Sequence, residues 1–266
     1  MNAFPRVNNT LIALAVMLSA SVASAQQAGT ATTPFEPRVG QPGKDVVWVP
    51  SPQALVDKML DMAKLTPQDY LMDLGSGDGR TVITAAKRGA TAVGVEYNPD
   101  MVALSKKNAE KEGVAGKATF MQADLFKTDL SKATVITMFL LPSINMQLRP
   151  SLLNLKPGTR IVSNTFTMED WEPDETFSVP SPCVSWCTAL LWIVPAKVQG
   201  VWKMPQGTLT LTQQFQKLTG TLGTAPISEG KVNGDEISFT AGGTKYTGKL
   251  NGNTIQGQGW TASRVN

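Results

Sequence analysis

A glycine-rich turn directly after a short apolar run constrains the fold of this chain more than any other feature. Residues 71–80 read LMDLGSGDGR, with an acid, Asp73, near the end of the apolar run and glycines at positions 75, 77 and 79. Glycine adopts backbone conformations that other residues avoid, and it lets the main chain approach a ligand closely. Such a turn between a strand and a helix is typical of α/β proteins that bind a ligand at the sheet edge.

Strand-like and helix-like segments alternate on both sides of this turn. Apolar runs of strand length are separated by segments with helical periodicity, glycine ends and proline in the first turn. This alternation predicts a doubly wound, mostly parallel sheet with helices on both faces. The predicted strands are 70–74, 91–96, 118–122, 133–141, 159–166 and 189–196, and the predicted helices between them are 80–89, 98–113 and 143–155.

The pattern changes near Lys197. Residues 198–266 contain many glycines and short runs of alternating apolar and polar residues, as in GTLTLTQQF and EISFTAG. Turn signals such as VNGDE and LNGNT recur roughly every 8 to 12 residues, which is typical of antiparallel hairpins. The pattern predicts a small C-terminal antiparallel β domain, and a compact barrel is one form that it could take.

The N-terminus has the pattern of an export signal. Arg6 is the only charge among residues 1–25, an apolar run follows at 11–20, and ASA at 23–25 offers a small-x-small cleavage site. The run is shorter than the ~20 apolar residues of a transmembrane helix, so no stable membrane span is expected, although an uncleaved anchor is an alternative. We therefore predict a signal peptide over 1–25, a flexible linker over 26–45, and a periplasmic or secreted protein.

Composition excludes several classes of site. The net charge is +3, from 24 basic and 21 acidic residues, which is too balanced to indicate binding to nucleic acid or to a membrane surface. The chain has no histidine, which excludes a Ser-His-Asp triad and a histidine-ligated metal site, and no metal is expected. Cys183 and Cys187 could form a short-loop disulfide in an oxidising compartment or remain two unpaired thiols.

Two familiar glycine-rich motifs do not match the turn. A dinucleotide fold requires G-x-G-x-x-G, but Arg80 occupies the place of the last glycine, and Asp73 would repel a pyrophosphate. A phosphate-binding P-loop requires Gly-Lys-Ser/Thr after a longer loop, and that sequence is absent from the turn.

A ligand with a positive head fits the turn better, and S-adenosylmethionine is such a ligand. Its amino group and sulfonium favour an acid such as Asp73, while its carboxylate suits the N–H groups at a helix N-terminus. Glu96, 21 residues after Gly75, could accept from the ribose hydroxyls, and Asp124 from the adenine amino group. The candidate cofactor-binding residues are Asp73, Gly75, Ser76, Gly77, Asp78, Gly79, Glu96 and Asp124.

The stretches DLGSGDGR, GVEYNPDMVALS, QADLF and TMFLLPS resemble the class I (seven-strand, Rossmann-like) S-adenosylmethionine-dependent methyltransferases. Within that class the chain is similar to the lysine methyltransferases related to the ATP-synthase c-subunit methyltransferase, over about residues 48–195. The resemblance implies that 46–197 is a methyltransferase-like domain and that Asp73, Gly75, Gly77 and Glu96 hold the cofactor, with Asp124 near adenine. It also implies that Phe139, Leu140, Leu141 and Pro142 line the acceptor pocket.

The resemblance implies methyl transfer to a protein lysine amine. This reaction mainly requires alignment of the amine with the methyl group and exclusion of water, so no acid or base residue is assigned. Two alternatives stay open at this point. One is an exported, non-catalytic binding protein that keeps the fold, and the other is a methyltransferase that acts on a small molecule.

Overall fold

The computed structural model describes residues 1–3 and 35–265. Most of the predicted signal peptide, from residue 4, and residues 26–34 of the predicted linker lie outside this part of the chain. Over the described residues, no helix combines the length and the apolar character that a membrane crossing requires.

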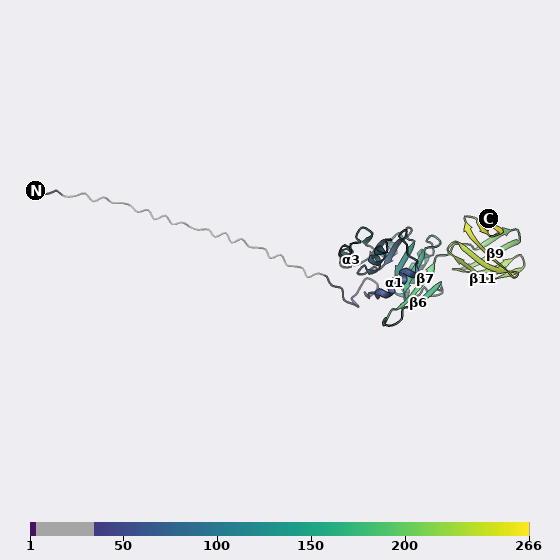
Figure 1. The fold of residues 1–266 in the computed structure, drawn as a ribbon, viewed down its shortest axis with the longest axis horizontal. Helices are drawn as coiled ribbons and strands as arrows, with labels where there is room; N and C mark the ends of the chain where they lie inside the picture. Colours follow the sequence, from purple (N-terminus) through teal and green to yellow (C-terminus); the bar gives the residue numbers. More distant parts are fainter. Residues whose placement is uncertain (4–34, 266) are drawn as a thin grey trace. The chain divides into compact units, whose positions relative to one another are not determined.

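The first folded region alternates strands and helices, as the sequence predicts, and appears blue to green in Figure 1. Helices α2, α3 and α4 begin where a glycine or proline follows a strand, and α3 is capped by Asn98, whose side chain accepts from the N–H of Asp100 at 2.9 Å. The elements are α1 (Gln53–Met62), β1 (Tyr70–Leu74), α2 (Arg80–Lys87), β2 (Thr91–Glu96), α3 (Pro99–Lys111), β3 (Ala118–Gln122), η1 (Leu125–Lys127), β4 (Val135–Met138), α4 (Pro142–Leu152), β5 (Arg160–Asn164), β6 (Glu175–Ser178) and β7 (Thr188–Ile193).

In the described part of the chain, seven of these strands form one sheet in the order β3-β2-β1-β4-β5-β7-β6. The first five are parallel, and β7 runs antiparallel to both β5 and β6. The order reverses at β1, which lies between β2 and β4. Ligands of open α/β sheets bind beyond the carboxyl ends of the strands at such a reversal, so the topology points to the end of β1.

The side chains of the sheet alternate between two hydrophobic cores. Leu71 of β1 faces the core formed with α1, α2 and α3, whereas its neighbour Met72 faces the core that contains α4 and the indoles of Trp171 and Trp192. Helices therefore cover both faces, which confirms the predicted doubly wound architecture.

Strand β6 is not predicted from the sequence. All four of its residues are exposed at the sheet edge, so the segment ETFS has no apolar alternation that would indicate a strand. Its pairing with β7 is a consequence of tertiary structure, because β7 offers an unpaired side once it has paired with β5.

The C-terminal region forms a closed antiparallel barrel, drawn in green to yellow in Figure 1. This confirms the predicted β domain and fixes its form. Trp202 and Trp260 are buried among the apolar side chains that fill the barrel. The strands are β8 (Gly200–Met204), β9 (Gly207–Gln214), β10 (Lys217–Leu222), β11 (Ala225–Asn233), β12 (Glu236–Ala241), β13 (Thr244–Asn251), β14 (Thr254–Gly257) and β15 (Trp260–Arg264).

The barrel is joined to the sheet region by an aromatic stack and two ion pairs. Phe215 stacks on Trp171, with ring centroids 5.9 Å apart. The Asp174 side chain is only 7% exposed, and its Oδ1 lies 2.9 Å from Nζ of Lys231 on β11. The second pair, between Lys217 and Glu172, is more than half exposed on both sides. Because a buried carboxylate needs a charge partner, the Lys231 pair is the more important of the two.

We predict that Lys231→Met lowers the free energy of unfolding by about 2 kcal/mol, because the Asp174 carboxylate stays buried and loses its cation. The matched variant Lys217→Met removes the exposed pair and is expected to cost less than about 1 kcal/mol. Urea unfolding of the two variants measures the difference. Equal, small losses in both would contradict the importance assigned to Asp174.

Candidate functional site

A pocket opens at the carboxyl ends of β1, β2 and β4, where the strand order reverses. The glycine turn forms its floor, and the segment 41–51 forms the opposite wall. Of the residues predicted from sequence, the pocket is lined by Asp73, Gly75, Ser76, Gly77, Asp78, Glu96, Asp124, Phe139 and Leu140.

The glycines of the turn adopt the left-handed conformation that the motif predicts. The φ angles are 77° at Gly75 and 54° at Gly77, and a Cβ atom at Gly77 would lie 2.5 Å from Nε1 of Trp48. Gly79 has a different surrounding, because it lies behind the pocket wall, where a Cβ would come within 2.7 Å of the Phe120 ring. Gly79 therefore allows the turn to pack on β3 and does not itself line the pocket.

Asp73 is buried at the end of β1 and faces the pocket. Its Oδ1 accepts a hydrogen bond of 2.6 Å from the Thr137 hydroxyl on β4. Burial raises the pKa of Asp73 from 3.8 to about 7, the Thr137 hydrogen bond opposes that change, and the negative charges of Glu96 and Asp78 add to it. A positive group in the pocket would stabilise the ionised carboxylate and lower this pKa.

Glu96 ends β2 and organises the backbone around the pocket. Its Oε2 accepts from the N–H of Gly77 at 3.0 Å, and its Oε1 accepts from the N–H groups of Tyr97 and Asn98 at 2.9 Å. A carboxylate offers about four acceptor positions. These three bonds leave one for a ligand hydroxyl, and they also fix the glycine turn against β2.

Asp124 lies at the end of the third strand, where its Oδ1 caps η1 by accepting from the Phe126 N–H at 3.0 Å. Its Oδ2 lies 2.9 Å from Nζ of Lys44, which also sits 4.9 Å from the centre of the Tyr97 ring. The hydrogen bond between them raises the pKa of Lys44 and lowers the pKa of Asp124. Lys44 therefore covers the part of the pocket where adenine is expected.

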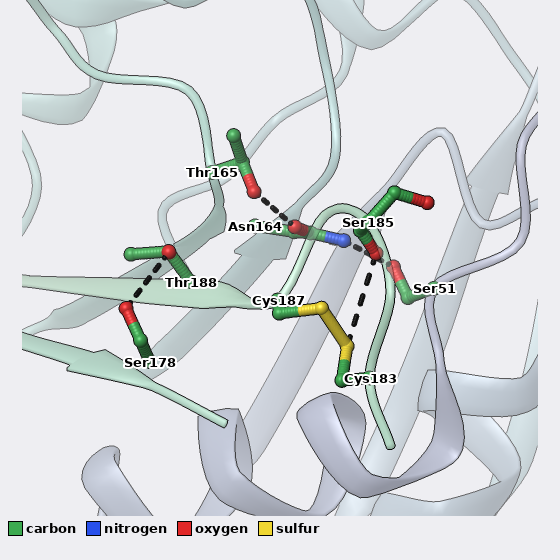
Figure 2. The surroundings of a disulfide bond; sticks show 8 residues. All are labelled: Ser51, Asn164, Thr165, Ser178, Cys183, Ser185, Cys187 and Thr188. Carbon is green, nitrogen blue, oxygen red and sulfur yellow. Dashed lines mark hydrogen bonds between the residues drawn. A yellow bond between two sulfur atoms is a disulfide. The ribbon is translucent and has the colours of Figure 1, made fainter. Parts of the chain in front are cut away.

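The segment 41–51 is part of the site, although the sequence places residues up to 45 in a linker. Pro42 and Val47 form a β-bridge, and the Trp48 N–H donates to the Gln41 carbonyl at 2.9 Å. At its far end, the Asn164 amide donates to the Ser51 hydroxyl at 3.0 Å, as Figure 2 shows. The apolar run VVWV just before α1 is the signal that could have found this wall, because an apolar run needs a surface to pack on.

The residues predicted to bind the acceptor separate into two groups. Phe139 and Leu140 line the pocket, and together with Leu141 they also line an adjoining apolar groove. Pro142 lines neither, because it is the first residue of α4, where its fixed φ starts the helix. The other walls of the groove are residues 42–47, Val49, Phe166 and Trp186.

A disulfide joins Cys183 to Cys187, which resolves the alternative left open by the sequence (Figure 2). The closed loop contains Trp186, one of the groove residues. No local signal in the sequence predicts that this loop lies near the end of β4.

The residues of the pocket fit S-adenosylmethionine. Ser76 Oγ is buried with no hydrogen-bond partner in the described residues, and it packs against Gly94 of β2, so Ser76 contributes to the pocket by its position in the turn. Asp73 is a buried carboxyl that a cationic group would stabilise, and Glu96 has one acceptor position left for a hydroxyl. Gly75 and Gly77 let the side chains of Leu140 and Trp48 pack directly on the turn, because a Cβ would lie 3.1 Å from Leu140 Cδ2 at Gly75 and 2.5 Å from Trp48 Nε1 at Gly77.

The comparisons with known proteins agree with this chemistry. Residues 73–175 match the family described as the ANTKMT methyltransferase domain. A protein-lysine N-methyltransferase of Saccharolobus islandicus is 46% identical over 137 residues, which cover 50% of this chain and 85% of that protein. The human lysine N-methyltransferase named for the c-subunit of ATP synthase is 38% identical over 48% of this chain and 54% of its own length.

A solved structure, an RNA methyltransferase from Salinibacter ruber in complex with S-adenosyl-L-homocysteine, is similar with a TM-score of 0.53 and 46% identity. The match covers 56% of this chain and 96% of that one. The chain thus spans most of these microbial proteins but only about half of the human relative.

We predict a pH dependence that originates in Asp73. The folded carboxyl, with its pKa of about 7, holds its proton more tightly than the unfolded one, with a pKa of 3.8. The resulting contribution to the free energy of unfolding is fully present below pH 3.8 and is lost as the pH rises through 7. From pH 5 to pH 8 the ligand-free protein should lose about 2–3 kcal/mol of unfolding free energy.

The comparison that isolates this effect is Asp73→Asn, measured by urea unfolding at each pH. Because the chain has no histidine, few other side chains titrate in this range, and the variant should show a nearly flat profile. The same loss of stability in the wild type and the variant would contradict the assignment to Asp73.

Proposed function

Since this chain belongs to the class I S-adenosylmethionine-dependent methyltransferases of the protein-lysine N-methyltransferase type, we propose that it transfers a methyl group to a lysine amine of a protein. The observation that carries the proposal is that the pocket at the strand ends is continuous with the apolar groove beside it. The cofactor pocket and the apolar groove share Phe139, Leu140 and residues 42–47, so a side chain in the groove would end beside the cofactor. This arrangement favours an enzyme over a non-catalytic binding protein.

The residues of the pocket have distinct proposed roles. Asp73 attracts the positive amino acid end of the cofactor. Glu96 accepts from a ribose hydroxyl while it holds the turn through Gly77. Asp124 accepts from the adenine amino group through Oδ2, the oxygen that is paired with Lys44 in this structure. Lys44 then moves aside or shares this oxygen with the adenine.

When bound, S-adenosylmethionine supplies a methyl group on a positively charged sulfur, and transfer forms an N–C bond as the S–C bond breaks. The apolar walls formed by Phe139 and Leu140 exclude water from the amine. Desolvation lowers the pKa of a lysine, so the walls favour the neutral amine with its free lone pair. The lysine ammonium loses one proton to bulk water before the attack, and the alignment of the neutral amine with the methyl group supplies most of the catalysis.

The acceptor can be tested with S-adenosylmethionine labelled in the methyl group. Extracts of the source cells, divided into protein and RNA, are incubated with the purified protein, and labelled protein is hydrolysed to identify the modified amino acid. Methyl-lysine supports the proposal. Label found only in RNA or only in small molecules would contradict the lysine acceptor, although it would still show that the protein is a methyltransferase.

We predict that Glu96→Ala weakens S-adenosylmethionine binding by at least about 30-fold, or about 2 kcal/mol, because it removes a ribose acceptor and frees the turn. Calorimetric titration measures the affinity. Glu110→Ala, an exposed change on α3, serves as the matched control and should bind like the wild type. Unchanged affinity in Glu96→Ala would remove this carboxylate from the cofactor site.

We also propose that the protein acts after export, with 1–25 removed as a signal peptide. Two observations support this. The N-terminal pattern around Arg6 and residues 23–25 suits a cleaved signal, and the Cys183–Cys187 disulfide suits an oxidising compartment.

Fractionation of cells that express the full chain tests the export. We expect the mature protein to begin at Gln26 by mass spectrometry and to be found outside the cytoplasm. An intact N-terminus in the cytoplasmic fraction, with both thiols reduced, would contradict the proposal.

A further inference from the structure

Three aromatic rings from separate segments meet beside the cofactor pocket. Phe139 follows β4, Phe166 follows β5, and Trp186 belongs to the disulfide loop. Phe139 and Phe166 stack with ring centroids 5.9 Å apart and an interplanar angle of 18°. Trp186 is tilted against both, at 5.8 Å from Phe139 and 5.3 Å from Phe166. Such contacts stabilise one another and place a continuous aromatic surface along the groove.

Trp186 is held there by its loop. The disulfide closes the loop, and Trp186 itself has a φ of 56°, a backbone conformation that residues other than glycine rarely adopt. After the loop, the Thr188 carbonyl accepts from the Thr165 N–H at 2.7 Å, which ties the start of β7 to the end of β5 next to Phe166. Figure 2 shows the disulfide with Asn164, Thr165 and Thr188 around it. Backbone strain of this kind is typical of functional sites.

Trp186 is nevertheless 40% exposed. A large ring whose only role is core packing is usually more buried than this. Trp186 lines the groove together with Leu141 and residues 42–47. The groove is continuous with the cofactor pocket through Phe139 and Leu140. A residue outside the predicted acceptor motif therefore completes the wall of the passage to the cofactor.

From this geometry we infer that Trp186 is an acceptor-binding residue, which with Phe139 and Phe166 receives the side chain of the substrate lysine. The inference rests on the proposed function and adds the part of the chain that selects the acceptor. The four methylene groups of lysine can lie along the aromatic surface, and its nitrogen can reach the pocket. Aromatic faces also attract ammonium groups, whereas the two charged residues of the groove, Lys44 and Asp45, pair with each other at 3.7 Å.

The test compares Trp186→Ala with the wild type on one lysine peptide. An array of lysine-centred peptides, incubated with the full-length protein and labelled S-adenosylmethionine, identifies the best acceptor. On that peptide, Trp186→Ala should raise KM about tenfold and change kcat by less than about twofold. Trp186→Phe, which keeps a ring, should recover most of the loss.

Two controls separate the role of Trp186 from folding and from the proposed function. The affinity for S-adenosylmethionine, measured by calorimetry, should be equal in the wild type and Trp186→Ala. Val184→Ala changes another side chain of the same loop, which is 96% exposed, and should leave KM unchanged.

If the wild type methylates lysine peptides and Trp186→Ala has an unchanged KM, the inference is overturned and the proposed function stands. The inference is also overturned if Val184→Ala raises KM as much as Trp186→Ala, because the loop would then act only as a whole. Failure of the wild type to methylate any peptide or protein lysine would overturn both.

Discussion

The burial of one carboxyl at the end of a strand is the constraint on which the rest of the site depends. Asp73 lies at the point where the strand order reverses, and its ionised form is unfavourable until a positive group arrives. The glycine turn allows a ligand to come that close, and Glu96 holds the turn in place through the Gly77 N–H. A pocket built in this way prefers a cationic ligand over a phosphate, which accounts for the departure from dinucleotide motifs.

Much of this arrangement could be predicted from sequence because it depends on local patterns. Asp73 and Glu96 lie at the ends of β1 and β2, Asp124 follows β3, and the carboxyl ends of these parallel strands meet at one edge. Two other parts of the site could not be predicted, for equally physical reasons. The segment 41–51 lines the pocket through long-range packing of Trp48, and Trp186 reaches the groove through a loop whose course depends on β5 and β7. Neither position follows from local periodicity.

The barrel adds a second fold to a methyltransferase core. It is fixed to the sheet region through buried Asp174 and the stack of Phe215 on Trp171, so it has a defined place in the structure. These contacts involve the segment between β5 and β6. The segment between β6 and β7 carries the disulfide loop with Trp186. The chain between β5 and β7 therefore contributes both to the attachment of the barrel and to the groove beside the pocket.

The proposed function places a positive group of S-adenosylmethionine against Asp73, and proton release tests this placement most directly. Calorimetric titrations at pH 6, in buffers with different ionisation enthalpies, measure the protons exchanged on binding. A carboxyl with a pKa of about 7 is mostly protonated at that pH and must ionise beside the cation. We expect release of close to one proton by the wild type and almost none by Asp73→Asn. Binding without proton release by the wild type, or no binding by the folded protein, would contradict the role of Asp73.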